Sequence, residues 1–256
     1  MTEIHGTCTP EFEAVRTAFA ANFDAGNELG ASACVTHHGE TVVDIWAGDR
    51  DLEGNPWERD TIVNVWSTTK TMAATTLLLL ADRGELDLDA PIAALWPEFA
   101  ANGKEAITMA QVMGHTAGLP GFDPAIAAAD LYDHDLCAAN LAAQAPWWEP
   151  GTMSGYHLIS QGYLEAEVVR RITGRTLGEV FRTEIAEPLG AAFYLGLPPD
   201  LEAAVQLEAH ARAGVDGAGL GSPHPMLHLG KDLLDRVEVR GVGREECELC
   251  ADAADR

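Results

Sequence analysis

The sequence predicts an α+β fold in which a helical domain lies beside an antiparallel sheet. Two strand patterns, residues 31–36 and 41–48, flank the turn sequence His38-Gly39-Glu40 and predict a hairpin. A helix pattern precedes this hairpin, and the chain from the hairpin to residue 197 carries mainly helix and loop patterns. Because each element must bury an apolar face, we expect the first helix to pack on one face of the sheet.

The helix patterns can be taken in chain order. The first runs from Pro10 to Gly26, with Phe12, Val15, Phe19 and Phe23 recurring at steps of three and four residues. Residues 57–65 read as an extended connector, and a long apolar helix pattern over residues 72–83 ends at Gly84. A short helix is predicted to end at Trp96, and another, capped by Thr108, spans residues 108–113. Three further helices are predicted at 124–145, 160–172 and 176–185.

Composition excludes some classes of partner. The chain of 256 residues is 47% hydrophobic, which is sufficient for a globular core, and carries a formal net charge of −24. Phosphate backbones and anionic membranes repel such a chain, so we expect neither nucleic acid nor a membrane as partner. The charge says little about the substrate of an enzyme, because a high acidic content also serves solubility.

The N-terminal residues and the cysteines predict a cytoplasmic location. Residues 1–6 have neither the basic segment nor the apolar segment of a secretory signal, and the longest apolar run is too short to span a bilayer. Five scattered cysteines without a signal indicate reduced thiols. Cys247 and Cys250 form a lone C-x-x-C pair, which lacks the second half of a zinc site, so we expect no metal there.

The motif that points most directly to catalysis is Ser67-Thr68-Thr69-Lys70, at the beginning of the long apolar helix. On a helix, residues three apart lie on one face, so the amine of Lys70 would stand beside the hydroxyl of Ser67. A serine hydroxyl becomes a nucleophile when a neighbouring base takes its proton, and an amine can do this. With five serines and three lysines in the chain, such a pair is rare by chance. The alternative is a Ser that caps the helix and a Lys that faces solvent.

Three stretches together resemble one family. They are Ser67-Thr68-Thr69-Lys70, His115-Thr116-Ala117-Gly118-Leu119 and Pro150-Gly151-Thr152-Met153-Ser154-Gly155-Tyr156-His157. In these motifs the chain resembles the serine beta-lactamase-like hydrolases, and among them the class C-related carboxylesterases of family VIII. The resemblance covers residues 8–200, which we expect to form one partial hydrolase domain. It implies the beta-lactamase/penicillin-binding-protein-like fold.

The resemblance also implies a catalytic set of three residues. Ser67 would be the acylated nucleophile, Lys70 would accept its proton, and Tyr156 would complete the base pair and protonate the leaving group. A phenol can do so if a nearby ammonium lowers its pKa from about 10. From the residues alone, Tyr156 could instead be an aromatic packed at the start of the helix at 160–172.

Residues near these three are predicted to shape the substrate pocket. Trp66, Trp148 and His157 could line the space for the acyl group, or each could be a core or rim aromatic. For His115, which could serve as a Ser–His base, the resemblance implies a structural role. Lactamases carry a Tyr-x-Asn motif, whereas here Leu158 replaces the Asn, and this difference favours esterase over lactamase activity.

The C-terminal quarter departs from the family pattern. All 17 aromatic residues lie within residues 1–194, and the atypical tail, 201–256, has the composition of a disordered segment. The family also has a Lys-Thr-Gly-like or His-Thr-Gly-like strand near its C-terminus, whose backbone N–H completes the oxyanion hole. No stretch here fits that strand. We therefore expect a shortened member of the family, with an incomplete sheet whose open edge could mediate oligomerisation.

The sequence therefore predicts a serine hydrolase that works by acyl transfer. The expected substrate is a small ester, with weak activity on beta-lactams, and no metal or nucleotide cofactor is implied. Two alternatives remain open. One is an inactive truncated homologue or binding module that keeps the cleft, and the other is a D-amino-acid peptidase using the same Ser–Lys–Tyr set.

Overall fold

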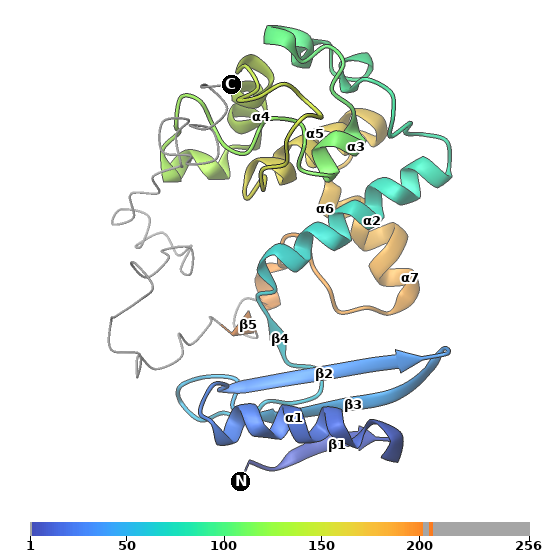
Figure 1. Cartoon of the computed structure of the whole chain (residues 1–256), viewed down its shortest axis with the longest axis vertical. Coiled ribbons are helices and arrows are strands. Elements are labelled where there is room, and N and C mark those ends of the chain that lie inside the picture. Colours follow the sequence, from blue (N-terminus) through green and yellow to red (C-terminus); the bar gives the residue numbers. More distant parts are fainter. Residues whose placement is uncertain (1, 202–204, 207–256) are drawn as a thin grey trace. The chain divides into compact units, whose positions relative to one another are not determined.

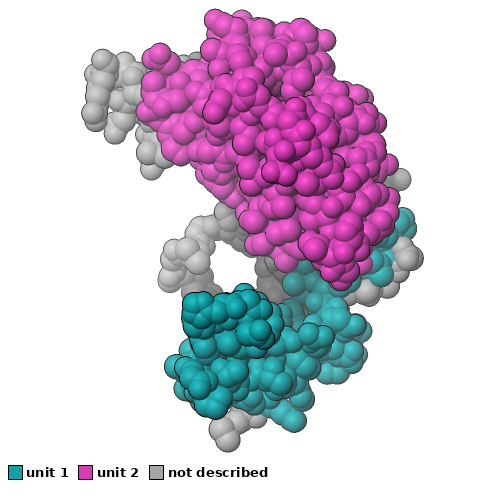
Figure 2. Space-filling view, turned by 90° about the vertical axis from the view of Figure 1, so that its right-hand side faces the viewer, with its two compact units in different colours: residues 1–64, 197–228 teal, residues 65–196, 229–256 magenta. Residues whose placement is uncertain are grey.

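The computed structural model describes residues 2–201 and 205–206 of the chain. The chain divides into two compact units, which are coloured separately in Figure 2. Among the described residues, unit 1 comprises residues 2–64, 197–201 and 205–206, and unit 2 comprises residues 65–196. Within the described residues, unit 1 carries an antiparallel sheet with one helix, and unit 2 carries helices α2 to α7 (Figure 1).

The predicted hairpin is confirmed in unit 1. Its strands are β2 (Gly30–His37) and β3 (Glu40–Gly48), which pair antiparallel. His38 and Gly39 connect them, with positive φ angles of 51° and 84°. Two consecutive residues with positive φ angles form a tight turn whose twist matches that of the flanking strands.

A third strand, β1 (Ile4–Cys8), pairs antiparallel with β3 and gives the sheet order β1-β3-β2. The sequence pattern does not predict β1, because Gly6 interrupts it and its three central residues are exposed. The sheet therefore contains one strand in addition to the predicted hairpin. Within the described residues β2 is paired on one side only, and association through this edge stays a prediction.

Helix α1 (Glu13–Asp24) packs against β1 and β3, as expected for a helix covering one face of the sheet (Figure 1). A 3-10 turn, Pro10–Phe12, leads into it, and Gly26 follows its end with φ 71°. Fully buried side chains alternate along β3 with more exposed ones; they are Val43, Ile45 and Ala47. In the predicted connector, the short strand β4 (Ile62–Val63) pairs in parallel with β5 (Val205–Gln206).

Unit 2 is built from helices around one apolar core. Its α-helices are α2 (Thr69–Asp82), α3 (Met109–Met113), α4 (His134–Ala143), α5 (Ser160–Thr173), α6 (Leu177–Phe181) and α7 (Glu187–Leu189). Helix α5 packs against α2, α3, α4 and α6, so it stands at the centre of the unit. The fully buried core side chains include Leu77, Phe99, Leu119, Leu141, Leu164 and Val168.

Two of the predicted helices differ from the structure. The predicted helix 124–145 is wrong in its first part, where a 3-10 helix, Ala128–Tyr132, is followed by α4. Asp133 interrupts the pattern because its side chain accepts a hydrogen bond from the backbone N–H of Leu136 and so begins a new helix. The predicted helix 176–185 starts as α6 and then widens into a π-helical segment, Arg182–Ala186.

The short helix α3 depends on its N-terminal cap, so we expect the protein to become less stable when the cap is removed. The Thr108 side chain accepts from the backbone N–H of Gln111, and the Gln111 side chain accepts from the backbone N–H of Thr108. Thr108→Ala is expected to lower the free energy of unfolding by about 1 kcal/mol, measured by urea denaturation. Thr75→Ala, at an exposed position within α2, is the control; equal effects of the two changes would contradict the prediction.

Some predictions lie outside the described residues. These include nearly all of the predicted tail, 201–256, with Cys247 and Cys250. The described cysteines are free thiols, namely Cys8, Cys34 and Cys137. Over residues 2–201 and 205–206, no helix has the length and hydrophobicity needed to cross a membrane. In the same residues, no three His, Cys, Asp or Glu side chains form a group that could hold a metal ion.

Candidate active site

Ser67 lies where the chain enters α2. It belongs to the 3-10 turn Trp66–Thr68, which runs directly into the helix, and it is exposed. The position predicted for Ser67, at the beginning of the long apolar helix, is therefore confirmed. Trp66 has φ 47°, in the left-handed region that non-glycine residues seldom adopt. Backbone strain of this kind persists only where the surrounding structure holds it, and it is concentrated at functional sites.

Lys70 stands beside Ser67, as the three-residue spacing predicts. Its Nζ lies 3.5 Å from Ser67 Oγ and donates a hydrogen bond of 2.8 Å to the backbone carbonyl of Leu158. Leu158 belongs to the segment just before α5, 88 residues further along the chain. The side-chain pattern could not have revealed this contact, because its acceptor is a backbone atom. It fixes the amine at the position from which it reaches the serine hydroxyl.

Tyr156 completes the group. Lys70 Nζ lies 4.9 Å from the centre of its ring, and the residue is about half exposed. A hydrogen bond with Ser67 lowers the pKa of Tyr156, against the opposing effect of burial. A hydrogen bond with Lys70 and the charge of its ammonium lower this pKa further. The fold thus brings Ser67, Lys70 and Tyr156 together, although Tyr156 comes from a different part of the chain.

His157 is fully buried, and both of its ring nitrogens contact backbone atoms. Nε2 accepts from the backbone N–H of Leu119 at 3.1 Å, so Nδ1 carries the proton that it donates to the carbonyl of Gly155 at 2.6 Å. Burial lowers the pKa of His157 to about 4, and the nearby His115 contributes to the same shift. The ring is therefore neutral at physiological pH, and it fixes the backbone next to Tyr156.

His115 acts in the same network. Its Nδ1 accepts from the backbone N–H of His157 at 3.2 Å, and its carbonyl accepts from the backbone N–H of Gly155 at 3.0 Å. Burial lowers the pKa of His115, and the charge of Lys70 lowers it further. One ring nitrogen is thus occupied by a backbone donor. This arrangement agrees with the structural role expected for His115.

Trp148 packs against the segment that carries Tyr156. A Cβ at Gly155 would lie 2.4 Å from the Trp148 ring, so only glycine allows this approach. The Trp148 ring also stands edge-on to that of His157, with centroids 6.3 Å apart. Trp66 and Trp148 are both half-buried, whereas His157 is not exposed at all. Of the three predicted pocket residues, the two tryptophans therefore retain surface that a substrate could contact.

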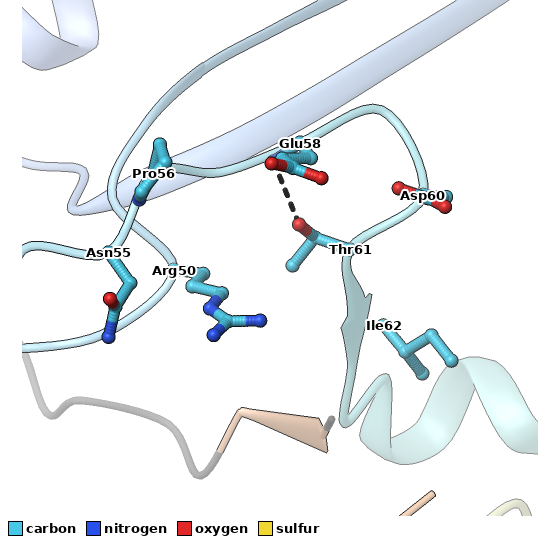
Figure 3. Close-up of a pocket in the computed structure, with 7 residues that line it drawn as sticks. All are labelled: Arg50, Asn55, Pro56, Glu58, Asp60, Thr61 and Ile62. Carbon is cyan, nitrogen blue, oxygen red and sulfur yellow. Dashed lines mark hydrogen bonds between the residues drawn. The ribbon is translucent and has the colours of Figure 1, made fainter. Parts of the chain in front are cut away.

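A separate pocket of about 390 Å³ lies in unit 1 and is shown in Figure 3. It is lined by Arg50, Asn55, Pro56, Glu58, Asp60, Thr61 and Ile62. A hydrogen bond joins Glu58 and Thr61, and the pocket combines one cationic side chain with two carboxylates. None of the predicted site residues belongs to it.

Comparison with known proteins connects this geometry to one family. The Beta-lactamase family model matches residues 16–228. The Esterase/beta-lactamase LipL of Mycobacterium tuberculosis is 41% identical over 198 residues, which cover 77% of this chain and 46% of LipL.

Two crystal structures agree with this match. One, of a family VIII carboxylesterase, has a TM-score of 0.76 and 48% identity, over 80% of this chain and 57% of that one. The other, of a penicillin-binding protein homolog from Caulobacter crescentus, has a TM-score of 0.77 and 43% identity, over 80% of this chain and 56% of that one. The chain spans about half the length of these relatives.

Proposed function

Because the chain belongs to the beta-lactamase family, we propose that it is a serine hydrolase that cleaves small carboxylic esters through an acyl-enzyme on Ser67. The observation that supports this most is the approach of Lys70 Nζ to within 3.5 Å of an exposed serine hydroxyl. A nucleophile and a base within reach, with the base oriented by a third group, are the parts that acyl transfer requires.

In the first step the Ser67 hydroxyl attacks the ester carbonyl while Lys70 accepts its proton. The Leu158 carbonyl orients the amine and limits its freedom to turn away from the serine. The developing oxyanion needs donors that are already in place, and we assign one of them to the backbone N–H of Ser67, in the turn before α2. One such donor contributes about 3 kcal/mol in the transition state.

In the second part of the step Tyr156 protonates the alcohol that leaves. Lys70 Nζ lies 3.5 Å from Ser67 Oγ and 4.9 Å from the centre of the Tyr156 ring, and we assign to these three groups the transfer of the serine proton to the leaving oxygen. About half of the Tyr156 surface is exposed, so the residue is accessible to the leaving alcohol and to the water that follows. Water then attacks the acyl-enzyme with the same groups acting in reverse.

The surroundings of this group favour an ester with apolar parts. Leu158 stands where lactamases carry the Asn of their Tyr-x-Asn motif, and it is almost half exposed. Trp66 and Trp148 offer the half-buried aromatic surface that we assign to the acyl group. His157 is fully buried and binds the backbone of Leu119 and Gly155, so we assign it a supporting role and no contact with the substrate. Weak hydrolysis of beta-lactams is a second proposed activity, supported by the name Esterase/beta-lactamase given to LipL.

Steady-state assays with three substrates test the proposal. We expect the purified chain to hydrolyse p-nitrophenyl butyrate, to hydrolyse a chromogenic cephalosporin more slowly, and to leave a D-alanyl amide intact. Hydrolysis of the amide but not of the esters would favour the D-amino-acid peptidase. A folded chain that is inert to all three substrates would overturn the proposal in favour of a binding module.

Removing only the phenolic oxygen tests the role of Tyr156. Tyr156→Phe is expected to lower kcat for the ester by about 10²- to 10³-fold, because the leaving alcohol loses its proton donor. Tyr132→Phe, at a similarly exposed tyrosine in the same unit, is the matched control. If both variants keep the activity of the unmodified chain, Tyr156 has no part in proton transfer.

A further inference from the structure

His115 binds the chain on both sides of Tyr156. Its ring nitrogen Nδ1 accepts a hydrogen bond from the backbone N–H of His157 at 3.2 Å, and its carbonyl accepts from the backbone N–H of Gly155 at 3.0 Å. Tyr156 lies between these two residues, so one histidine holds both of its neighbours in the chain. Neither contact takes part in the proton transfers proposed for ester hydrolysis.

Two side chains also contact the ring of Tyr156. The His115 ring meets it edge to face, with the ring centroids 4.7 Å apart and an angle of 60° between the planes. Lys70 Nζ lies 4.9 Å from the centre of the same ring. Because about half of the Tyr156 surface is exposed, the core does not enclose this side chain. His115 therefore supplies one of the contacts that orient the phenol.

The backbone of His115 is in an unusual conformation. Its φ is 60°, in the left-handed region that non-glycine residues seldom adopt, and the residue lies just after α3. Such strain persists only where surrounding contacts hold it, and it is concentrated at functional sites. With this backbone, both the carbonyl and the ring of His115 reach the segment that carries Tyr156.

Only a neutral ring can make the side-chain hydrogen bond. Because Nδ1 of His115 accepts, the neutral ring carries its proton on Nε2. A second proton would occupy Nδ1 and make it a donor that faces another donor. His157 is fully buried, so its backbone N–H would then lose its partner away from water, which is unfavourable. Burial lowers the pKa of His115, and the charge of Lys70 lowers it further.

The groups around His115 also agree with a neutral ring. The titratable residues that contact the ring are Tyr156 and His157, and His157 is itself neutral because burial lowers its pKa to about 4. Helix α3 carries no titratable side chain, and Glu149 on the adjacent loop is exposed. Among the described residues no carboxylate acts on His115, so none stabilises an imidazolium there.

We propose that His115 is a positioning residue whose neutral ring holds Tyr156 beside Ser67, and that protonation of this ring releases Tyr156. The proposal rests on the assignment of Tyr156 as proton donor in the proposed function. When Nδ1 gains a proton, the His157 N–H loses its acceptor and the phenol loses its fixed position. Ester hydrolysis therefore declines as the pH falls through the pKa of His115, and this loss is absent above that pKa.

Two substitutions separate the acceptor from the ring. In His115→Asn the side-chain oxygen replaces Nδ1 as acceptor, and asparagine accepts a left-handed backbone and does not titrate. In His115→Phe a ring remains but the acceptor is lost. We expect His115→Asn to keep kcat for p-nitrophenyl butyrate within about threefold, whereas His115→Phe lowers kcat about 10- to 100-fold with little change in KM.

A second histidine provides the matched control. His38 also has a positive φ, 51°, but it lies in the hairpin turn of unit 1, so His38→Phe should leave kcat unchanged. If His115→Phe keeps the kcat of the unmodified chain, or if His115→Asn loses as much as His115→Phe, the ring nitrogen is not the group that matters and the proposal is overturned.

Nuclear magnetic resonance gives a readout that does not depend on activity. Long-range ¹H–¹⁵N spectra report which ring nitrogen carries the proton, and His115→Asn identifies the signals of His115. We expect the proton on Nε2 at neutral pH, and a shift of the His157 backbone amide at the midpoint of the His115 titration. A proton on Nδ1, or an amide that does not respond at that midpoint, would show the proposal to be wrong. If both responses appear in a chain that hydrolyses no ester, the proposed function fails and the hold of His115 on this segment stands.

Discussion

Replacing Ser67 by alanine is expected to lower kcat/KM for p-nitrophenyl butyrate by at least about 10⁴-fold. The variant lacks the oxygen that forms the acyl bond, so only the contribution of binding and of the oxyanion donor remains. The fold should be unaffected, because Ser67 is exposed and lies before the first residue of α2. Steady-state kinetics with enzyme-free blanks measure the loss, and circular dichroism checks that the helices are intact.

The neighbouring residue offers a matched control for Ser67. Thr68→Ala removes a hydroxyl from the same turn, and this side chain makes no capping hydrogen bond to α2. We expect it to keep the activity of the unmodified chain within about threefold. Equal activity of the Ser67 and Thr68 variants would show that hydrolysis occurs elsewhere on the chain.

Replacing Lys70 by methionine is expected to lower kcat/KM by about 10³-fold. Methionine keeps much of the length of the side chain but can neither accept the serine proton nor donate to the Leu158 carbonyl. Lys70→Arg separates the two roles, because arginine keeps the positive charge and its hydrogen bonds yet does not act as a base at neutral pH.

The two Lys70 variants give different results under different mechanisms. If Lys70 takes the proton, the arginine variant is about as inactive as the methionine variant. If the charge alone matters, for instance by keeping Tyr156 ionised, the arginine variant retains most of the activity. That second result would assign the base to Tyr156, whose pKa hydrogen bonding to Ser67 and Lys70 already lowers.

Local spacing explains why part of the site was predictable. Ser67 and Lys70 are three residues apart at the beginning of a helix, so the sequence alone brings their side chains together. Tyr156 lies almost ninety residues away, and no local rule places it there; only the resemblance to the family did. The beta-lactamase/penicillin-binding-protein-like fold that the resemblance implied is confirmed by the crystal structures of relatives.

Other features of the site and the fold depend on contacts that no local sequence pattern predicts. Backbone atoms of Leu119 and Gly155 bind the two ring nitrogens of the buried His157, and the side-chain pattern of the sequence cannot reveal such backbone partners. Strand β1 escaped prediction because it is short and mostly exposed, and so lacks a buried face to give it a pattern.

The most direct measurement of the central claim is the site at which a fluorophosphonate attaches. Such a probe forms a stable bond to a serine that has a functioning base beside it. Intact mass and peptide mapping are expected to show one phosphonate per chain, located on Ser67 and lost in both Ser67→Ala and Lys70→Met. A folded chain that remains unlabelled, or that carries the probe on another residue, would contradict the account.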